Sequence, residues 1–192
     1  MVVLAIPNGG VPLAIEVAEM LHADLDIIVC RKLALPMISE GGLGAVADDG
    51  TFVVNDEVVE RNGVKREMVE YEMEQVKANI RERKLLYTGN KVPARLIGKT
   101  AIIVDDGLAS GITMKVAVES VMHRKPEKVA VAIPVASETG YNRVSEVAPV
   151  YTCAVVSTKQ FYLADFYRNW RDLSEQEVLH SLKLWRQRHN II

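Results

Sequence analysis

Five short apolar runs alternate with amphipathic helical stretches along the chain, and this alternation constrains the fold more than any other feature of the sequence. Each run is almost continuously apolar, which is typical of strands that are covered on both faces in a parallel sheet. Strands that alternate with helices predict an α/β fold, with a parallel doubly wound sheet of about five strands flanked by helices. The expected strands are VVLAI (2–6), LDIIVCR (25–31), TAIIVDD (100–106), KVAVAIPVA (128–136) and VYTCAVV (150–156).

Helical spacing of apolar residues marks the stretches between and after these strands. In the first stretch the spacing places Leu13, Val17 and Leu21 on one face. A later stretch is long and densely charged, and we expect its charged residues to form a solvated face over a buried stripe. That stripe comprises Met68, Val69, Val76 and Ile80. The expected helices cover residues 11–22, 65–86, 112–123 and 175–188.

Two segments interrupt the alternation and are expected to elaborate one domain. Residues 44–90 contain a predicted β-hairpin over 44–55, with Asp49-Gly50 as the turn dipeptide, followed by the long helix. This hairpin, together with residues 40–44, is expected to form a mobile lid. Residues 157–192 are expected to form a small C-terminal hood and a closing helix. Since the chain has 192 residues and no internal repeat, we expect a single domain over 1–192.

Composition and charge exclude several classes of protein. The net charge is -2, from 23 basic and 25 acidic residues, which offers no basic footprint and makes nucleic acid an unlikely partner. The apolar runs are too short to span a membrane, and the first residues lack the basic start of a signal peptide, so we expect a cytoplasmic protein. Cys30 and Cys153 lie in apolar runs and are expected to be buried, reduced thiols. The four histidines are not at metal-ligand spacing.

An acidic pair, Asp105-Asp106, follows the third apolar run and precedes a loop of small residues. Ligands of parallel α/β sheets bind outside the carboxyl ends of the strands, where this pair is expected. The loop residues 107–111 are small enough for backbone N–H groups to converge on an anion, and the helix that begins near Ile112 adds its positive dipole end. Thr113 supplies a hydroxyl there. A sugar phosphate fits both parts, because the loop takes the phosphate and the carboxylates accept hydrogen bonds from ribose hydroxyls.

A purely structural alternative is that Asp105 caps the following turn and that Asp106 points at solvent. The loop is neither a Walker loop nor a GxGxxG fingerprint. The whole stretch IIVDDGLASGIT (102–113) nevertheless resembles the phosphoribosyl-pyrophosphate (PRPP) signature of type I phosphoribosyltransferases. The resemblance implies that Asp105 and Asp106 hold the ribose hydroxyls and are catalytic. It also implies a 5-phosphate site, formed by Ala109, Ser110, Gly111, Ile112 and Thr113.

Other parts of the chain occur in the order of the same family. The loop IPNGG (6–10) takes the place of the family's pyrophosphate loop, and the second expected strand ends in Arg31-Lys32. The pyrophosphate site implied by the resemblance comprises Asn8, Gly9, Gly10, Arg31 and Lys32. The chain most resembles a group of stand-alone phosphoribosyltransferases with a PxGG loop. That group commonly has arginine in place of Asn8 and a helix before the first strand, so we expect a missing charge and a sheet flank that is either partly uncovered or covered by a partner.

The reaction that the resemblance implies is displacement of pyrophosphate from C1 of PRPP by a nitrogenous base that the sequence does not identify. It further implies that Mg²⁺ is bound through substrate oxygens, with Asp105 and Asp106 as candidate ligands. The resemblance also implies that the protein is a homodimer. Relatives that act on 6-oxopurines carry an aspartate where this chain has Ala109, which disfavours hypoxanthine–guanine salvage. The aromatic tail is expected either to stack on the base or to pack against the final helix. Its candidate residues are Phe161, Phe166 and Tyr167.

Two other functions are compatible with parts of this pattern. One is a non-catalytic regulator that senses PRPP or a nucleotide on the same fold. The other uses Asp105 as a phosphatase-type nucleophile, and it is disfavoured because such sites need Asp-x-Asp spacing whereas these aspartates are adjacent.

Overall fold

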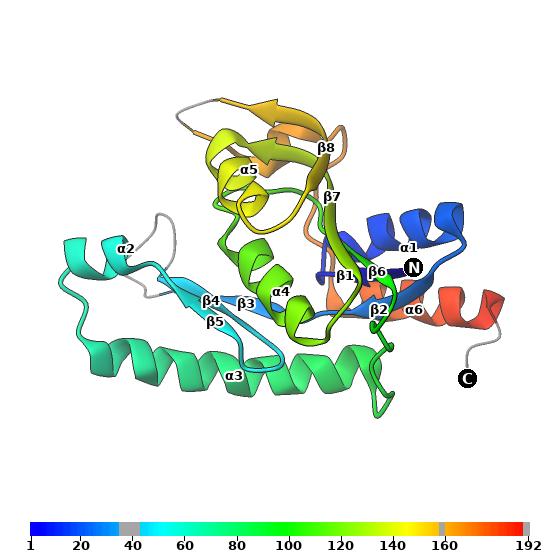
Figure 1. Cartoon of the computed structure of the whole chain (residues 1–192), viewed down its shortest axis with the longest axis horizontal. Helices are drawn as coiled ribbons and strands as arrows, with labels where there is room; N and C mark the ends of the chain where they lie inside the picture. The colour runs from blue at the N-terminus through cyan, green and yellow to red at the C-terminus, as the bar shows by residue number, and fades with distance from the viewer. Residues whose placement is uncertain (35–42, 158–159, 190–192) are drawn as a thin grey trace.

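A five-stranded sheet in the order β2-β1-β6-β7-β8 forms the centre of the protein, and every neighbouring pair of its strands is parallel. The computed structural model describes residues 1–34, 43–157 and 160–189 (Figure 1). The parallel α/β fold predicted from the apolar runs is therefore confirmed. The strands of this sheet are β1 (Val2–Ala5), β2 (Asp24–Ile27), β6 (Thr100–Val104), β7 (Lys128–Ser137) and β8 (Val150–Val156).

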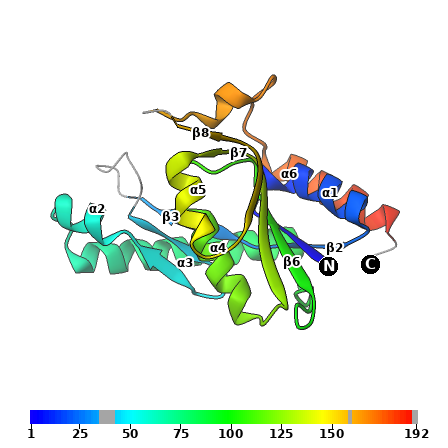
Figure 2. The ribbon, with the colours of Figure 1, turned by 45° about the horizontal axis from the view of Figure 1, so that its top comes forward.

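Helices cover both faces of the central sheet. On one face lie α1 (Gly10–Leu21) and α6 (Glu175–Arg188), which run side by side in Figures 1 and 2. On the other lie α4 (Ile112–His123) and α5 (Glu138–Ser145). The last of these, α5, was not among the expected helices.

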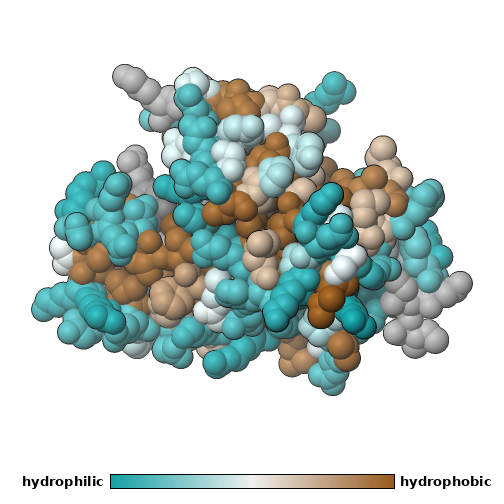
Figure 3. Space-filling model, in the orientation of Figure 1, coloured by the Kyte–Doolittle hydropathy of each residue, from teal (hydrophilic) through white to brown (hydrophobic). Residues whose placement is uncertain are grey.

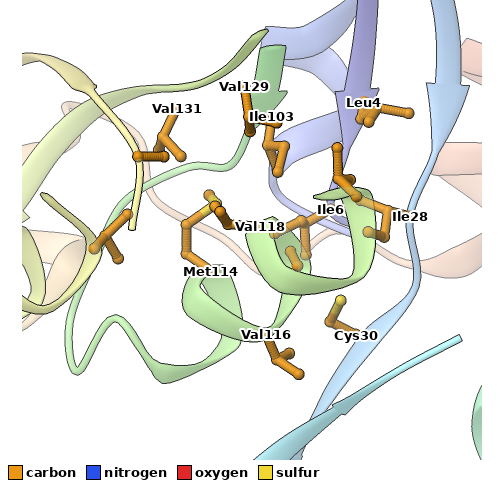
Figure 4. Close-up of a cluster of buried hydrophobic side chains, with 14 of the residues drawn as sticks. Leu4, Ile6, Ile28, Cys30, Ile103, Met114, Val116, Val118, Val129 and Val131 are labelled. Atoms are coloured by element: carbon orange, nitrogen blue, oxygen red, sulfur yellow. The ribbon is translucent and has the colours of Figure 1, made fainter. Parts of the chain in front are cut away.

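Alternation along the strands explains why both faces are apolar. Leu4 of β1 belongs to the cluster that contains Ile103 and Met114 (Figure 4), whereas the next residue, Ala5, belongs to the cluster on the α1 side. Successive side chains of a strand point to opposite faces, so an almost continuously apolar strand fills two cores at once. Because the strands are parallel, their carboxyl ends lie at the same edge of the sheet.

A second, antiparallel sheet lies beside the central one. It consists of β3 (Cys30–Leu33), β4 (Gly44–Ala47) and β5 (Phe52–Val54). The predicted hairpin is present as β4 and β5, and it is followed by α2 (Asp56–Arg61) and α3 (Arg66–Thr88). Residues 40–42 of the expected lid lie outside the described residues.

The prediction of one strand over 25–31 is wrong, because two strands in different sheets occupy that stretch. Strand β2 ends at Ile27, which pairs with Ala5, the last residue of β1. From Cys30 onward the chain pairs with β4, starting with Cys30 opposite Ala47. An apolar run does not show where its pairing partner changes.

The buried faces of two helices also differ from the expectation. Leu21 of α1 is 40% exposed, and the face turned to the sheet is instead formed by small and branched residues. In α3, Met68 is 47% exposed, while the other three residues of the expected stripe are buried. The buried residues of α1 are Gly10, Val11, Ala14, Ile15 and Ala18.

Strand β8 lies at the edge of the sheet and is not covered on both faces. Tyr151 and Val155 are 66% and 46% exposed, and Figure 3 shows apolar surface in this region at the top of the molecule. Cys153 is exposed as well, which corrects the expectation of a buried thiol, whereas Cys30 is buried as expected. The reason is that β8 is an edge strand, which pairs with β7 on one side only, and that α5 packs on one of its faces.

One flank of the sheet was expected to be partly uncovered or covered by a partner, and in the structure α6 packs beside β2. Leu182 and Trp185 of α6 are buried in the same cluster as Leu25 of β2. The helix begins at a capping box in which Ser174 and Glu177 satisfy each other's backbone N–H groups.

Among the described helices, none combines the length and apolar character that a membrane-spanning helix needs.

Candidate active site

Two loops meet at the carboxyl ends of the adjacent strands β1 and β6. A Cβ added to Gly9 would lie 1.7 Å from Asp106 Oδ2, and one added to Gly10 would lie 2.6 Å from the carbonyl oxygen of Val104. Real Cβ atoms do not approach so closely. At Gly10 the obstacle is backbone, so glycine is needed there for steric reasons, whereas a Cβ at Gly9 would require the Asp106 carboxylate to move. The first loop is thereby packed directly against the acidic pair.

A cavity of about 600 Å³ opens between these loops. It contains most of the site residues expected from the sequence, because both expected loops and the start of β3 contribute to its wall. The expected residues that line it are Asn8, Gly9, Arg31, Lys32, Asp105, Asp106, Ala109, Ser110, Gly111 and Thr113. Of the other expected residues, Gly10 is buried beneath the loop, and the side chain of Ile112 is buried in the core.

The two carboxyl groups of the acidic pair face an unfavourable environment. Burial raises the pKa of Asp105 well above its ordinary range, and the charge of Asp106 raises it further. Burial also raises the pKa of Asp106. The backbone N–H of Asp106 donates a hydrogen bond to Asp105 Oδ1 at 2.9 Å, which partly offsets the repulsion. A pair of carboxylates held in this way is stabilised by hydrogen-bond donors or by a cation.

The loop after the acidic pair is braced from the next strand and helix. Ser137 Oγ donates to the carbonyl oxygen of Ala109 at 2.5 Å, and Arg143 Nη1 donates to the carbonyl oxygen of Ser110. Gly111 has a positive φ of 73°, and a Cβ there would lie 2.8 Å from the carbonyl oxygen of Gly140. These contacts fix a loop whose small residues end at the N-terminus of α4, where backbone N–H groups favour an anion.

Basic side chains lie on the β3 side of the cavity. Arg31 Nε donates to Asn79 Oδ1 at 3.2 Å, and in the described part of the chain Arg31 forms no ion pair. Burial lowers the pKa of Arg31, and the charge of Arg83 lowers it further. Lys32 is exposed at the cavity. The guanidinium group of Arg31 and the ammonium group of Lys32 suit a polyanion.

Asn8 is engaged in a network that the sequence did not reveal. Its Oδ1 accepts hydrogen bonds from Tyr87 Oη at 2.7 Å and Arg83 Nη1 at 3.2 Å, and its Nδ2 donates to the carbonyl oxygen of Leu173 at 2.7 Å. Arg83 also pairs with Glu175 at 2.7 Å. The side chain of Asn8 therefore ties α3 to the C-terminal tail, and it brings the charge of Arg83 close to a position that itself lacks one.

The aromatic tail lies over the acidic pair, although not in the expected way. Phe161 and Phe166 stack on each other with ring centroids 5.1 Å apart, and neither lines the cavities at this site. Tyr167 Oη donates to the carbonyl oxygen of Asp106 at 2.7 Å. Burial raises the pKa of Tyr167 to about 12, assisted by the charges of the acidic pair. Leu163, which was not among the expected site residues, lies over Gly107. A Cβ added to Gly107 would be 2.4 Å from Leu163 Cδ1.

A second cavity, of about 480 Å³, adjoins the first under the tail. The site expected in the tail included Tyr167, which lines this cavity, whereas the walls from α1 and α3 were not expected, because no motif joins these segments. The residues that line both cavities are Asn8, Gly9, Arg31, Asp106 and Asp172. Those that line only the second are Pro12, Leu13, Arg83, Tyr167, Asn169, Trp170, Arg171 and Leu173.

The donor set at the acidic pair fits a divalent cation that is bound mainly through a substrate. In the described residues no group of three or more potential ligands could hold a metal ion by itself. Asp105 and Asp106 supply two carboxylates that gain from a nearby cation, and Mg²⁺ characteristically combines one or two carboxylates with substrate oxygens and water.

Together, a parallel α/β sheet, a glycine loop against an acidic pair and a braced loop at a helix N-terminus define an α/β domain with a loop suited to anions at the carboxyl edge of its sheet. The chain matches the phosphoribosyl transferase domain family over residues 1–167 and belongs to that family. It is 33% identical over 178 residues to the "Putative phosphoribosyl transferase Rv0571c" of Mycobacterium tuberculosis. That match covers 93% of this chain and 40% of the mycobacterial protein, so the chain spans less than half the length of this relative.

A solved structure supports the fold assignment. The chain resembles the crystal structure of TT1426 from Thermus thermophilus, with a TM-score of 0.77 and 30% sequence identity. The match covers 96% of this chain and 87% of the Thermus chain. The resemblance to type I phosphoribosyltransferases inferred from the loop sequences is thereby confirmed at the level of the family.

Proposed function

We propose that the protein is a phosphoribosyltransferase, which transfers the 5-phosphoribosyl group of PRPP to a nitrogenous base and releases pyrophosphate. The observation that carries the proposal is the first cavity. It combines the acidic pair Asp105-Asp106, the braced loop before α4 and the cations Arg31 and Lys32 in one wall. Each part matches one chemical part of PRPP, namely the ribose hydroxyls, the 5-phosphate and the diphosphate.

In this proposal the 5-phosphate lies in the loop formed by Ala109, Ser110, Gly111 and Thr113. Backbone N–H groups at the start of α4 bind it, and the Thr113 hydroxyl adds a hydrogen bond. Ile112 contributes only its backbone N–H, because its side chain is buried. Each such charge-assisted bond is worth roughly 1.5–3 kcal/mol, so a few of them hold a monophosphate.

The ribose lies over Asp105 and Asp106, whose carboxylates accept hydrogen bonds from its 2- and 3-hydroxyls. Positive charge develops on the ribose as the bond from C1 to the diphosphate breaks, and the two fixed carboxylates stabilise that charge. Arg31 and Lys32 stabilise the negative charge on the departing diphosphate. A bound Mg²⁺ would neutralise diphosphate oxygens, with the acidic pair as its protein ligands.

Calorimetric titration with PRPP and Mg²⁺ tests the donor half of this proposal. We expect the wild-type protein to bind PRPP and the Asp105→Asn/Asp106→Asn double variant to lose most of that binding. Asp165→Asn is the matched control, because Asp165 is an exposed carboxylate in the tail and lines neither cavity. Equal binding by the wild type and the double variant would refute the assignment.

Release of pyrophosphate across a panel of purine, pyrimidine and pyridine bases tests the transferase half. Release with at least one base is expected. The alternative of a non-catalytic regulator gains no support from the comparisons. It predicts tight PRPP binding without release of pyrophosphate for any base.

A further inference from the structure

Strand β8 forms one edge of the central sheet, at the top of the molecule in Figure 1. In the described part of the chain, the strand that pairs with it is β7 alone. An edge strand turns part of its backbone N–H and C=O groups away from the sheet, and these groups form a template for a strand of another chain. With the seven residues Val150–Val156, β8 has the usual length of a paired strand.

The side chains of β8 do not oppose the addition of a strand. Its sequence, VYTCAVV, contains no charged residue and no proline, which are the residues that commonly protect an edge. Most of its residues are β-branched or aromatic and favour an extended conformation. Tyr151, Cys153 and Val155, which alternate along the strand, are all exposed. The edge therefore presents apolar side chains together with its backbone groups.

The opposite edge of the same sheet is protected. Its strand, β2, carries Asp24, which pairs with Lys99 at 2.8 Å. It also carries Asp26, whose Oδ2 accepts a hydrogen bond from the backbone N–H of Ala94 at 2.8 Å. Two copies that paired through β2 would bring like charges together, which is unfavourable. The contrast identifies β8 as the edge that is open to a further strand.

The sequence of β8 is complementary to itself. A two-fold axis perpendicular to the sheet would make two β8 strands antiparallel, and all seven residues overlap when this axis passes beside Cys153, the middle residue. In that register Tyr151 lies opposite Val155 of the partner subunit. Aromatic and β-branched residues form favourable cross-strand pairs, and because the strand is uncharged no like charges meet. A second copy of this chain therefore fits the edge.

Exposed aromatic side chains beside β8 widen this surface. The short 3-10 helix Leu163–Phe166 lies beside β8 in Figures 1 and 2. Phe166 is 44% exposed, and Tyr162, which directly precedes this helix, is 60% exposed. Stable complexes bury about 800 Å² on each partner, which is more than the edge of a single strand supplies. The aromatic residues of the tail add apolar area to the edge.

We propose that the protein forms a homodimer through its β8 strands, which pair antiparallel about Cys153 and join the two central sheets into one continuous sheet. Residues of β8 line neither cavity of the candidate active site, so the pairing leaves both cavities open. The inference goes beyond the proposed reaction and does not depend on it.

Sedimentation equilibrium over a range of protein concentrations tests the dimer. We expect the wild type to dimerise, and the dissociation constant to rise on the order of a hundredfold in Cys153→Lys, because two ammonium groups then face each other across the axis. Cys153→Ser is the matched control and should dimerise like the wild type. A wild type that stays monomeric, or equal dimerisation by Cys153→Lys and the wild type, overturns the proposal.

Two double variants test which residues face each other. Tyr151→Lys/Val155→Lys places lysine opposite lysine and should be monomeric. Tyr151→Glu/Val155→Lys places a carboxylate opposite an ammonium group and should dimerise. Both variants change the same two positions, so a defect of folding would affect them alike. Equal association of the two variants overturns the register.

Oxidation by diamide provides an independent test of the register. Directly opposite residues of antiparallel strands have Cα atoms about 4.5–5.5 Å apart, which is within the range that a disulfide spans. Two Cys153 thiols are oxidised to one disulfide, and diamide takes up their two electrons and two protons. We expect a covalent dimer on a non-reducing gel for the wild type and none for Cys153→Ser, in which the buried Cys30 remains. A wild-type dimer that diamide does not link overturns the pairing about Cys153.

Discussion

The backbone of Gly9 lies against the carboxylate of Asp106, so closely that a Cβ at position 9 would be 1.7 Å from Asp106 Oδ2. This contact joins the loop after β1 to the loop after β6, and it sets the distance between the expected diphosphate and ribose sites. A side chain at position 9 would have to displace the Asp106 carboxylate, so glycine is favoured here by the space available and not by its φ angle.

Replacement of this glycine should separate the two loops. In Gly9→Ala we expect PRPP affinity to fall at least tenfold and the free energy of unfolding to fall by about 1–3 kcal/mol, which is typical of an overpacked site. Calorimetry and chemical denaturation measure the two effects. Val92→Ala is the control, since Val92 is 90% exposed and lines neither cavity. Unchanged PRPP binding in Gly9→Ala would show that the contact does not position the site.

The raised pKa values of Asp105 and Asp106 predict a conflict between stability and binding. At pH values above the ordinary carboxyl range the native state holds more protons than the unfolded chain, so the free energy of unfolding falls as pH rises. Asp105→Asn removes this ionisation. We expect a weaker pH dependence above about pH 4, a Tm at pH 7 that is a few degrees higher, and loss of PRPP binding. A lower Tm at pH 7 would contradict this account.

Tyr167 connects the tail to the acidic pair through its hydrogen bond to the carbonyl oxygen of Asp106. Tyr167→Phe should cost about 0.5–1.5 kcal/mol of stability at neutral pH. The pKa of about 12 adds a second signature. Between about pH 10 and 12 an unfolded tyrosine loses its proton while Tyr167 keeps it, so the wild type loses stability over this range and Tyr167→Phe loses less. Denaturation curves at neutral pH and across this alkaline range measure both effects, with the exposed Tyr151→Phe as control.

Arg143 holds the expected 5-phosphate loop from outside the first cavity, through its hydrogen bond to the carbonyl oxygen of Ser110. We expect Arg143→Gln to weaken PRPP binding several-fold, because the loop must then be ordered by the ligand. Arg168→Gln, which alters an exposed arginine of the tail, is the control. A change of equal size in both variants would indicate a general effect of charge.

Several features of this protein were predictable because they depend on neighbouring residues. The hairpin over 44–55, the helices 112–123 and 175–188 and the loop after the acidic pair are each specified by a short pattern of turn, capping or apolar residues. The strand predicted over 25–31 failed for the opposite reason. Its division between two sheets depends on where β1 ends and on where β4 lies, and neither is encoded in the strand itself.

The sequence by itself determined the parallel sheet and the donor loops, because apolar period and loop chemistry act over a few residues. Tertiary structure alone decided which distant segments complete the site. Asn8 meets Tyr87 and Arg83 across the packing of α3, and the tail brings Asp172 to the boundary of the two cavities. Such contacts between residues far apart in the sequence arise from the packing of whole helices and strands. This packing produces no periodic pattern of residues along the chain.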